Sequence, residues 1–223
     1  MQTLTISEEP LAEAYSPEEV DDEHLPNWAK RTEFAEDPLG RAYALLVTFL
    51  PVELLHLLPS PSEPLTSTNL MLSLSSGQLL CIAYNAGVRK SKKPWGYINK
   101  TAIHDIAALE AEAETPSGQD GNKEKPKVWT FRRTENLRLW AAALKLRYMI
   151  PLVTTSQLTG NATRNGTPAS SPSATTMAFQ NGLVPNLFDA PIVARREHLW
   201  EEMLHDAVLL WMGAVVSEKR GET

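Results

Sequence analysis

The sequence predicts an all-α fold, and three observations support this. Residues 128–148 and 197–216 carry apolar side chains at helical spacing. Alternating runs of Val, Ile and Tyr separated by hairpin turns, which would indicate strands, are weak throughout the chain. Stretches rich in Pro, Gly and Ser separate the apolar segments. We therefore expect helices joined by irregular loops.

The N-terminal part of the chain is acidic. Residues 8–37 carry eleven Asp and Glu side chains against only Lys30 and Arg31, within a chain of net charge −6. Residues 1–25 are also poor in large apolar side chains, so we expect them to be disordered. The remaining chain is close to neutral, and it lacks the strongly basic character of nucleic-acid-binding proteins.

The next segments favour short helices. Tyr43, Leu46, Val47 and Leu50 fall on one helical face, and Pro51 interrupts or restarts that helix. An apolar helical turn follows in residues 51–58. Residues 69–88 predict two helical pieces around Ser76 and Gly77, the second of them buried.

Two polar stretches predict loops within one domain. Residues 110–127 pass from a helix end into a linker with Gly and Pro, and residues 154–177 are rich in Ser, Thr, Asn and Ala. The helices on either side are too few for two cores. We therefore expect a single helical domain at 26–217 with two long insertions, followed by a tail at 218–223.

The two long apolar patterns predict the main core helices. In residues 131–148 the expected core stripe consists of Leu137, Trp140, Ala141, Leu144 and Tyr148. Thr134 is placed to cap this helix, and Glu135 suits its positive N-terminal end. The expected stripe of the last helix is Leu199, Trp200, Met203, Leu204, Ala207, Leu210, Trp211 and Ala214.

Three blocks of the sequence, in this order, resemble the calponin homology (CH) domain. They are "LSSGQLLCIAYNA" (74–86), "FRRTENLRLWAAALKLRY" (131–148), and the segment from Phe188 and Asp189 into the final helix. The resemblance implies a CH-like bundle of four main helices with short connecting helices. It also implies that Asn136 bonds a neighbouring loop and that Phe131 packs under its helix. An ordinary core position is the simpler interpretation of Phe131 and Trp140.

The sequence offers little for catalysis. The common motifs for metalloprotease, serine hydrolase, phosphate and dinucleotide sites are absent. His198, Glu202 and His205 would share a helical face and could hold a metal, although solvated polar residues are the simpler interpretation. Cys81 lies between Leu80 and Ile82, which favours a buried thiol over a nucleophile. We expect no enzymatic activity, cofactor or metal site.

A basic and aromatic segment is the best candidate for binding. Arg89, Lys90, Lys92 and Lys93 precede Trp95 and Tyr97, a combination that can steer and anchor an acidic surface. A solvated loop, with Trp95 packed inward, is the alternative. A second basic cluster would enlarge this surface if the two lie close in space; it comprises Lys123, Lys125, Lys127, Arg132 and Arg133.

These features predict a non-enzymatic interaction module with a protein partner. The resemblance implies a cytoskeletal or signalling adaptor that binds actin filaments or microtubules. The alternative is a scaffold subunit that binds through apolar helix faces or the acidic N-terminal segment. A single Cys fits a reducing compartment, so we expect a cytoplasmic protein. We expect neither nucleic acid, stable membrane insertion nor a small-molecule ligand.

Overall fold

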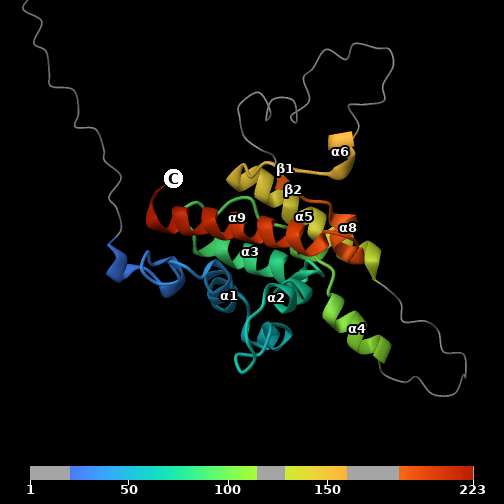
Figure 1. Cartoon of the computed structure of the whole chain (residues 1–223), viewed down its shortest axis with the longest axis horizontal. Helices are drawn as coiled ribbons and strands as arrows, with labels where there is room; N and C mark the ends of the chain where they lie inside the picture. The colour runs from blue at the N-terminus through green and yellow to red at the C-terminus, as the bar shows by residue number, and fades with distance from the viewer. Residues whose placement is uncertain (1–20, 115–128, 160–185, 223) are drawn as a thin grey trace, which may run out of the picture.

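The computed structural model describes residues 21–114, 129–159 and 186–222 (Figure 1). The α-helices are α1 (Pro38–Phe49), α2 (Ser67–Leu74), α3 (Gln78–Lys90), α4 (Ile106–Glu114), α5 (Thr130–Tyr148), α6 (Thr155–Thr159), α8 (Ala190–Arg195) and α9 (Trp200–Arg220). Short 3₁₀ helices span Asp22–His24, Asn27–Ala29, Val52–Leu57 and Lys100–Ala102. The strands β1 (Leu152–Val153) and β2 (Asn186–Leu187) form one parallel pair. The predicted all-α class is confirmed, apart from this short pair.

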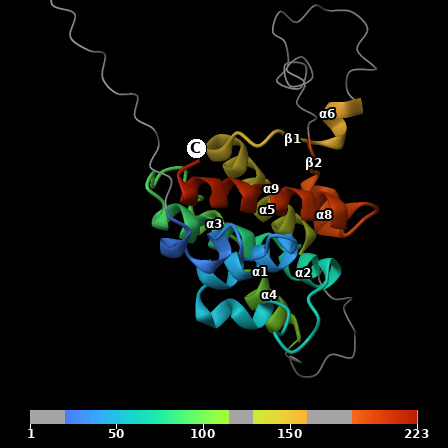
Figure 2. The ribbon, with the colours of Figure 1, turned by 60° about the vertical axis from the view of Figure 1, so that its left-hand side comes forward.

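The helices form a bundle in which α3, α5 and α9 lie close together. Helix α5 packs on α3 and α8, while α9 packs on α1 and α2. Figure 2 shows α1 and α2 on one side of α9 and the β1–β2 pair on the other. Within the described residues, no helix is both long and apolar enough to cross a membrane.

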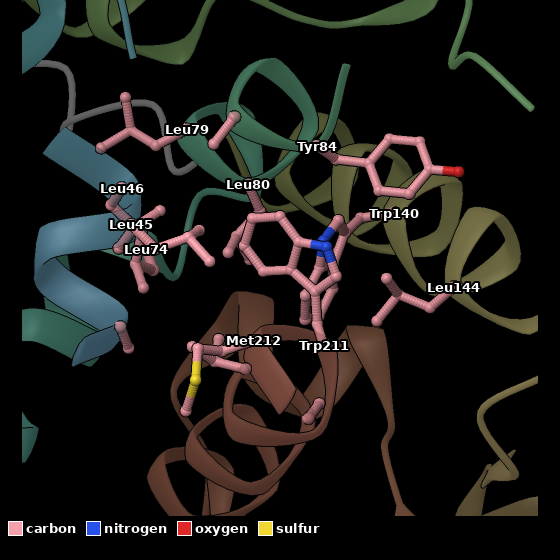
Figure 3. Close-up of a cluster of buried hydrophobic side chains, with 14 of the residues drawn as sticks. Leu45, Leu46, Leu74, Leu79, Leu80, Tyr84, Trp140, Leu144, Trp211 and Met212 are labelled. Atoms are coloured by element: carbon pink, nitrogen blue, oxygen red, sulfur yellow. The ribbon is translucent and has the colours of Figure 1, made fainter. Parts of the chain in front are cut away.

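Two tryptophans form the centre of the core. The rings of Trp140 on α5 and Trp211 on α9 meet edge to face with centroids 5.9 Å apart, and Figure 3 shows them among side chains of α1, α3, α5 and α9. Phe188 meets Trp140 from the other side at 5.8 Å. Leu137 and Leu144 are also fully buried, so the core stripe expected on α5 is confirmed at Leu137, Trp140 and Leu144, while Ala141 and Tyr148 are half-buried. Such aromatic contacts fix the angle between the two longest helices.

Helices α3 and α5 approach closely at Gly77 and Asn136. Gly77 begins α3 with a left-handed backbone (φ 72°), and a Cβ there would lie 2.8 Å from the backbone nitrogen of Leu137. The fully buried Asn136 side chain accepts from the His104 amide at 2.8 Å and donates to the carbonyls of His104 (2.9 Å) and Ser76 (3.3 Å). Asn136 therefore joins α5 to both neighbouring loops; a bond to a neighbouring loop was expected, but Asn136 was expected at the helix start and is instead the seventh residue of α5.

Two expectations for the start of α5 are wrong. The helix begins at Thr130, with Trp129 as its N-cap, so Thr134 is a buried residue of its second turn instead of a cap. Phe131 is 69% exposed and does not pack under the helix. The cause is the earlier start, because Phe131 then falls on the outer face with the exposed Arg138.

Several predicted boundaries also shift. Helix α9 runs to Arg220, beyond the tail boundary expected at 217. Leu199 precedes this helix in a left-handed conformation and is 45% exposed. In the α1 segment, Leu46 and Leu50 are buried as expected, but Val47 is 38% exposed and Leu45, which lies outside the expected stripe, is fully buried.

The ends of the two expected insertions are also helical. Helix α4 occupies the start of the 110–127 stretch, and α6 occupies 155–159. Residues 115–127 and 160–177 lie outside the described part of the chain, as do residues 1–20 of the acidic segment. The disorder expected up to residue 25 is wrong for residues 21–25, because Asp22–His24 form a 3₁₀ helix and Leu25 is buried in the core.

Two glycine substitutions test the α3–α5 contact. Gly77→Ala would add a Cβ to a left-handed residue pressed against α5, so we expect a loss of about 3 kcal/mol in unfolding free energy. Gly213→Ala is the matched control, because this α9 position has open space around it, and helix propensity predicts a gain of about 0.5–1 kcal/mol. Urea denaturation measures both values. Equal stability of Gly77→Ala and the parent protein would contradict the proposed close contact.

Candidate functional site

The basic and aromatic loop, residues 89–97, leaves the C-terminal end of α3. Two side chains hold its backbone. Arg147 of α5 donates to the carbonyls of Lys93 (2.7 Å) and Trp95 (2.8 Å). The Tyr84 hydroxyl donates to the carbonyl of Gly96 at 2.8 Å. The loop backbone is therefore fixed by hydrogen bonds to buried side chains.

Asn85 fixes the point where the loop returns to the bundle. Its Oδ1 accepts from the amide of Ile98 at 2.8 Å, and its Nδ2 donates to the carbonyl of the same residue at 2.9 Å. Both Asn85 and Ile98 are buried. A buried side-chain amide that hydrogen-bonds both the N–H and the C=O of one residue leaves the backbone of that residue little conformational freedom.

Arg147 is a buried cation with several partners. Besides the two loop carbonyls, its guanidinium donates to Ser91 Oγ at 2.9 Å and to a carboxylate oxygen of Glu218 on α9 at 2.6 Å. It also lies 5.5 Å from the ring centroid of Trp95 and 5.3 Å from that of Tyr148. Burial alone would lower the pKa of Arg147, but Tyr148 and Glu218 outweigh it and raise the pKa.

The charged side chains of the loop are largely open to solvent. Lys92, Lys93 and Arg89 are exposed, while Trp95 and Tyr97 are 52% and 46% exposed. Lys90 differs, because its ammonium donates to the Thr48 carbonyl at 3.1 Å. The loop therefore presents cations beside two half-exposed aromatic rings. Trp95 does not pack inward into the bundle; one face of its ring covers Arg147.

The described residues of the second basic cluster, Arg132 and Arg133, do not join this surface. Arg132 and Arg147 are 15 positions apart on α5, which corresponds to about 22 Å along the helix. The loop lies at the Arg147 end. Arg133 forms an ion pair with Glu110 of α4, and the Arg132 guanidinium lies 5.0 Å from the ring centroid of Trp129. Lys123, Lys125 and Lys127 lie outside the described residues.

The expectation that His198, Glu202 and His205 share one helical face, where they could hold a metal, is wrong. His198 is exposed and precedes the first residue of α9, so it does not lie on the helical face of Glu202 and His205. His205 contacts Asp206 at 3.3 Å. Among the described residues, no group of three or more His, Cys, Asp or Glu side chains is placed to hold a metal ion.

Cys81 is a buried thiol, as the sequence predicted. Its Sγ donates to the Asn136 carbonyl at 3.2 Å. Burial raises the pKa of Cys81 from 9.0 to about 12, so the thiolate is not populated near neutral pH. This environment stabilises the protonated thiol.

Sequence reasoning missed Arg147, Tyr84 and Asn85, the residues that shape the loop. Arg147 follows Lys145 near the end of α5, where a basic side chain is normally exposed to solvent. Asn85 ends the motif that suggested the CH resemblance, which was the available signal for a structural role. No protein-family model, curated protein or solved structure matches the chain.

Arg147→Lys tests whether this side chain holds the loop. A lysine keeps the charge near Glu218 but lacks the planar fork that reaches two carbonyls at once. We expect a loss of about 2 kcal/mol in unfolding free energy, and faster hydrogen exchange at amides of residues 92–97. Arg138→Lys, at an exposed position of the same helix, is the control. Unchanged exchange in the loop would show that Arg147 does not hold it.

The Cys81 pKa predicts how stability depends on pH. The unfolded thiol loses its proton near pH 9.0 and the folded thiol near 12, so its contribution is intact below about pH 9 and is lost as pH rises toward 12. Between pH 8 and pH 10.5 this amounts to about 2 kcal/mol. Urea denaturation should therefore show a shallower decline for Cys81→Ala than for the parent protein. Parallel declines would contradict the raised pKa.

Proposed function

We propose that the chain is a non-enzymatic protein-binding module whose 89–97 loop binds an acidic protein surface. The observation that carries the proposal is the fixed backbone of the loop, together with its exposed Arg and Lys side chains and its half-exposed Trp95 and Tyr97 rings. Arg147, Tyr84 and Asn85 hold the backbone, so binding need not order it. Trp95 and Tyr97 can contribute apolar contact area while Lys92 and Lys93 supply charge.

Actin filaments and microtubules are the partners that we propose first. The three sequence blocks that resemble the CH domain support a cytoskeletal or signalling adaptor, and both polymers have acidic surfaces. The single Cys of the chain supports a cytoplasmic setting for such an adaptor. The core of the proposed contact is Arg89, Lys92, Lys93, Trp95 and Tyr97. Lys90 is less available because it bonds the Thr48 carbonyl.

A scaffold subunit is the second candidate. Leu146 and Met149, near the C-terminal end of α5, are 74% and 83% exposed. Met149 and Trp95 line one hollow beside Arg147. An apolar partner surface could cover this region, and such a contact would depend little on salt.

The test is co-sedimentation with actin filaments and, separately, with microtubules at low and high salt. For the charge-reversed variant Lys92→Glu/Lys93→Glu we expect about tenfold or greater loss of affinity at low salt. Binding by the parent protein should also weaken as salt rises, because the Debye length shrinks from about 30 Å at 0.01 M to about 10 Å at 0.1 M.

The matched control is Arg132→Glu/Arg138→Glu, which reverses two charges on α5 away from the loop. Equal loss in this control would point to net charge and not to the loop. Unchanged sedimentation of Lys92→Glu/Lys93→Glu would contradict the proposal. Salt-independent binding to a stable partner would favour the scaffold function.

A further inference from the structure

A cavity of about 560 Å³ lies on the inner side of the loop, a volume within the roughly 300–1,000 Å³ of small-molecule sites. It lies between the N-terminal segment, the ends of α1 and α3, and the last turns of α9. Its apolar walls are Leu25, Pro26, Trp28, Phe49, Tyr148 and Val215.

The wall contributed by the N-terminal segment is anchored to the bundle. Arg41 of α1 donates to the carbonyls of Trp28 (2.9 Å) and Lys30 (2.8 Å). Arg220 of α9 donates to the carbonyl of Ala29 at 2.7 Å. The Trp28 ring meets Phe49 edge to face with centroids 5.4 Å apart. This side of the cavity is therefore part of the folded structure.

Phe49 also packs against α3, at Gly87. A Cβ at position 87 would lie 2.9 Å from a carbon of the Phe49 ring, so the ring can pack there only because residue 87 has no side chain. The Lys90 ammonium lies 5.4 Å from the centroid of the same ring. An aromatic wall thus meets a cation at the rim of the cavity.

The charges around the cavity are mainly positive. Lys90, Lys92 and Lys219 line it, from α3, the loop and α9. The lining carboxylate, Glu218, is bonded to Arg147 at 2.6 Å. Within the described part of the chain, no carboxylate forms an ion pair with Lys92 or Lys219. An anionic group at this rim would face these lysines, which carry no ion pair with another described residue.

We propose that this cavity binds a small amphipathic anion, with an apolar body and one anionic head group such as a carboxylate. The apolar walls would remove the body from water, and the lysines at the rim would hold the head group by charge-assisted hydrogen bonds. A neutral apolar molecule would use only the walls. The proposal goes beyond the protein-binding function and does not depend on it, because it rests on the cavity; Lys92 is the residue that the two proposed sites share.

Calorimetric titration with decanoate, below its micelle concentration, tests the site. We expect saturable binding of one decanoate per chain, with decan-1-ol binding at least about tenfold more weakly because it lacks the charge. Thr48→Trp should fill the cavity and reduce decanoate affinity about tenfold or more, since Thr48 lines it from an exposed position. Val47→Trp, one residue away and outside the cavity lining, is the control and should bind like the parent protein.

A second pair of variants tests the charge. Lys92 lines the cavity and Lys93 does not, so Lys92→Gln should weaken decanoate binding about threefold or more while Lys93→Gln leaves it unchanged. Thermal unfolding would establish that each variant is folded before titration.

Three outcomes would overturn the proposal. They are absence of decanoate binding, equal affinity for decanoate and decan-1-ol, and unchanged affinity in Thr48→Trp. Co-flotation with phosphatidylcholine–phosphatidylserine vesicles without binding of free decanoate would assign the lysines to a membrane surface and would also overturn it. Filament sedimentation of Thr48→Trp distinguishes the two proposals. A protein-binding loop should be unaffected by filling the cavity, so this variant should sediment with filaments like the parent protein.

Discussion

The buried guanidinium of Arg147 is the interaction on which the arrangement of the loop, α5 and α9 depends. A charged group away from water is stable only if its donors are satisfied and its charge is matched. Carbonyls of the loop, Ser91 Oγ and Glu218 satisfy the two terminal nitrogens of the guanidinium and match its charge, whereas Nε has no hydrogen-bond partner among the described residues. The same group therefore fixes the loop backbone and joins α5 to the end of α9. It also positions Glu218, which lines the cavity behind the loop.

The helical core could be predicted from sequence because apolar periodicity reports directly which face is buried. Leu137, Trp140 and Leu144 illustrate this, since each is fully buried at the expected spacing. The helix ends were harder to predict. Helix α5 begins after Trp129 without a hydrogen bond from a capping side chain. The general preference for polar residues at the N-cap therefore predicts Thr134 instead. Leu199 fits the apolar spacing of α9 but lies just before its first turn.

The candidate site was predicted only where its residues are consecutive in the sequence. Lys92, Lys93 and Trp95 stand together on one loop, so their clustering needed no tertiary knowledge. Arg132 belongs to the second basic cluster, which would enlarge the loop surface only if the two were close in space, and the length of α5 places it far from the loop. The cavity combines segments from residues 24–28 to residues 215–219, and its shape depends on packing between them. Nothing in local sequence encodes such an assembly, and Arg147 has no local signal that distinguishes it from a solvated cation.

The β1–β2 pair brings together two points that are far apart in the sequence. The amide of Asn186 donates to the Pro151 carbonyl at 2.9 Å, and the amide of Phe188 donates to the Val153 carbonyl at 2.8 Å. The bundle thus closes this connection with its own backbone bonds, and the entropic cost of a longer connection grows only with the logarithm of its length. The pairing holds Leu152 and Asn186 side by side, so a fluorescent reporter or an affinity tag added to the connection between them would start from two chain points that the bundle itself fixes.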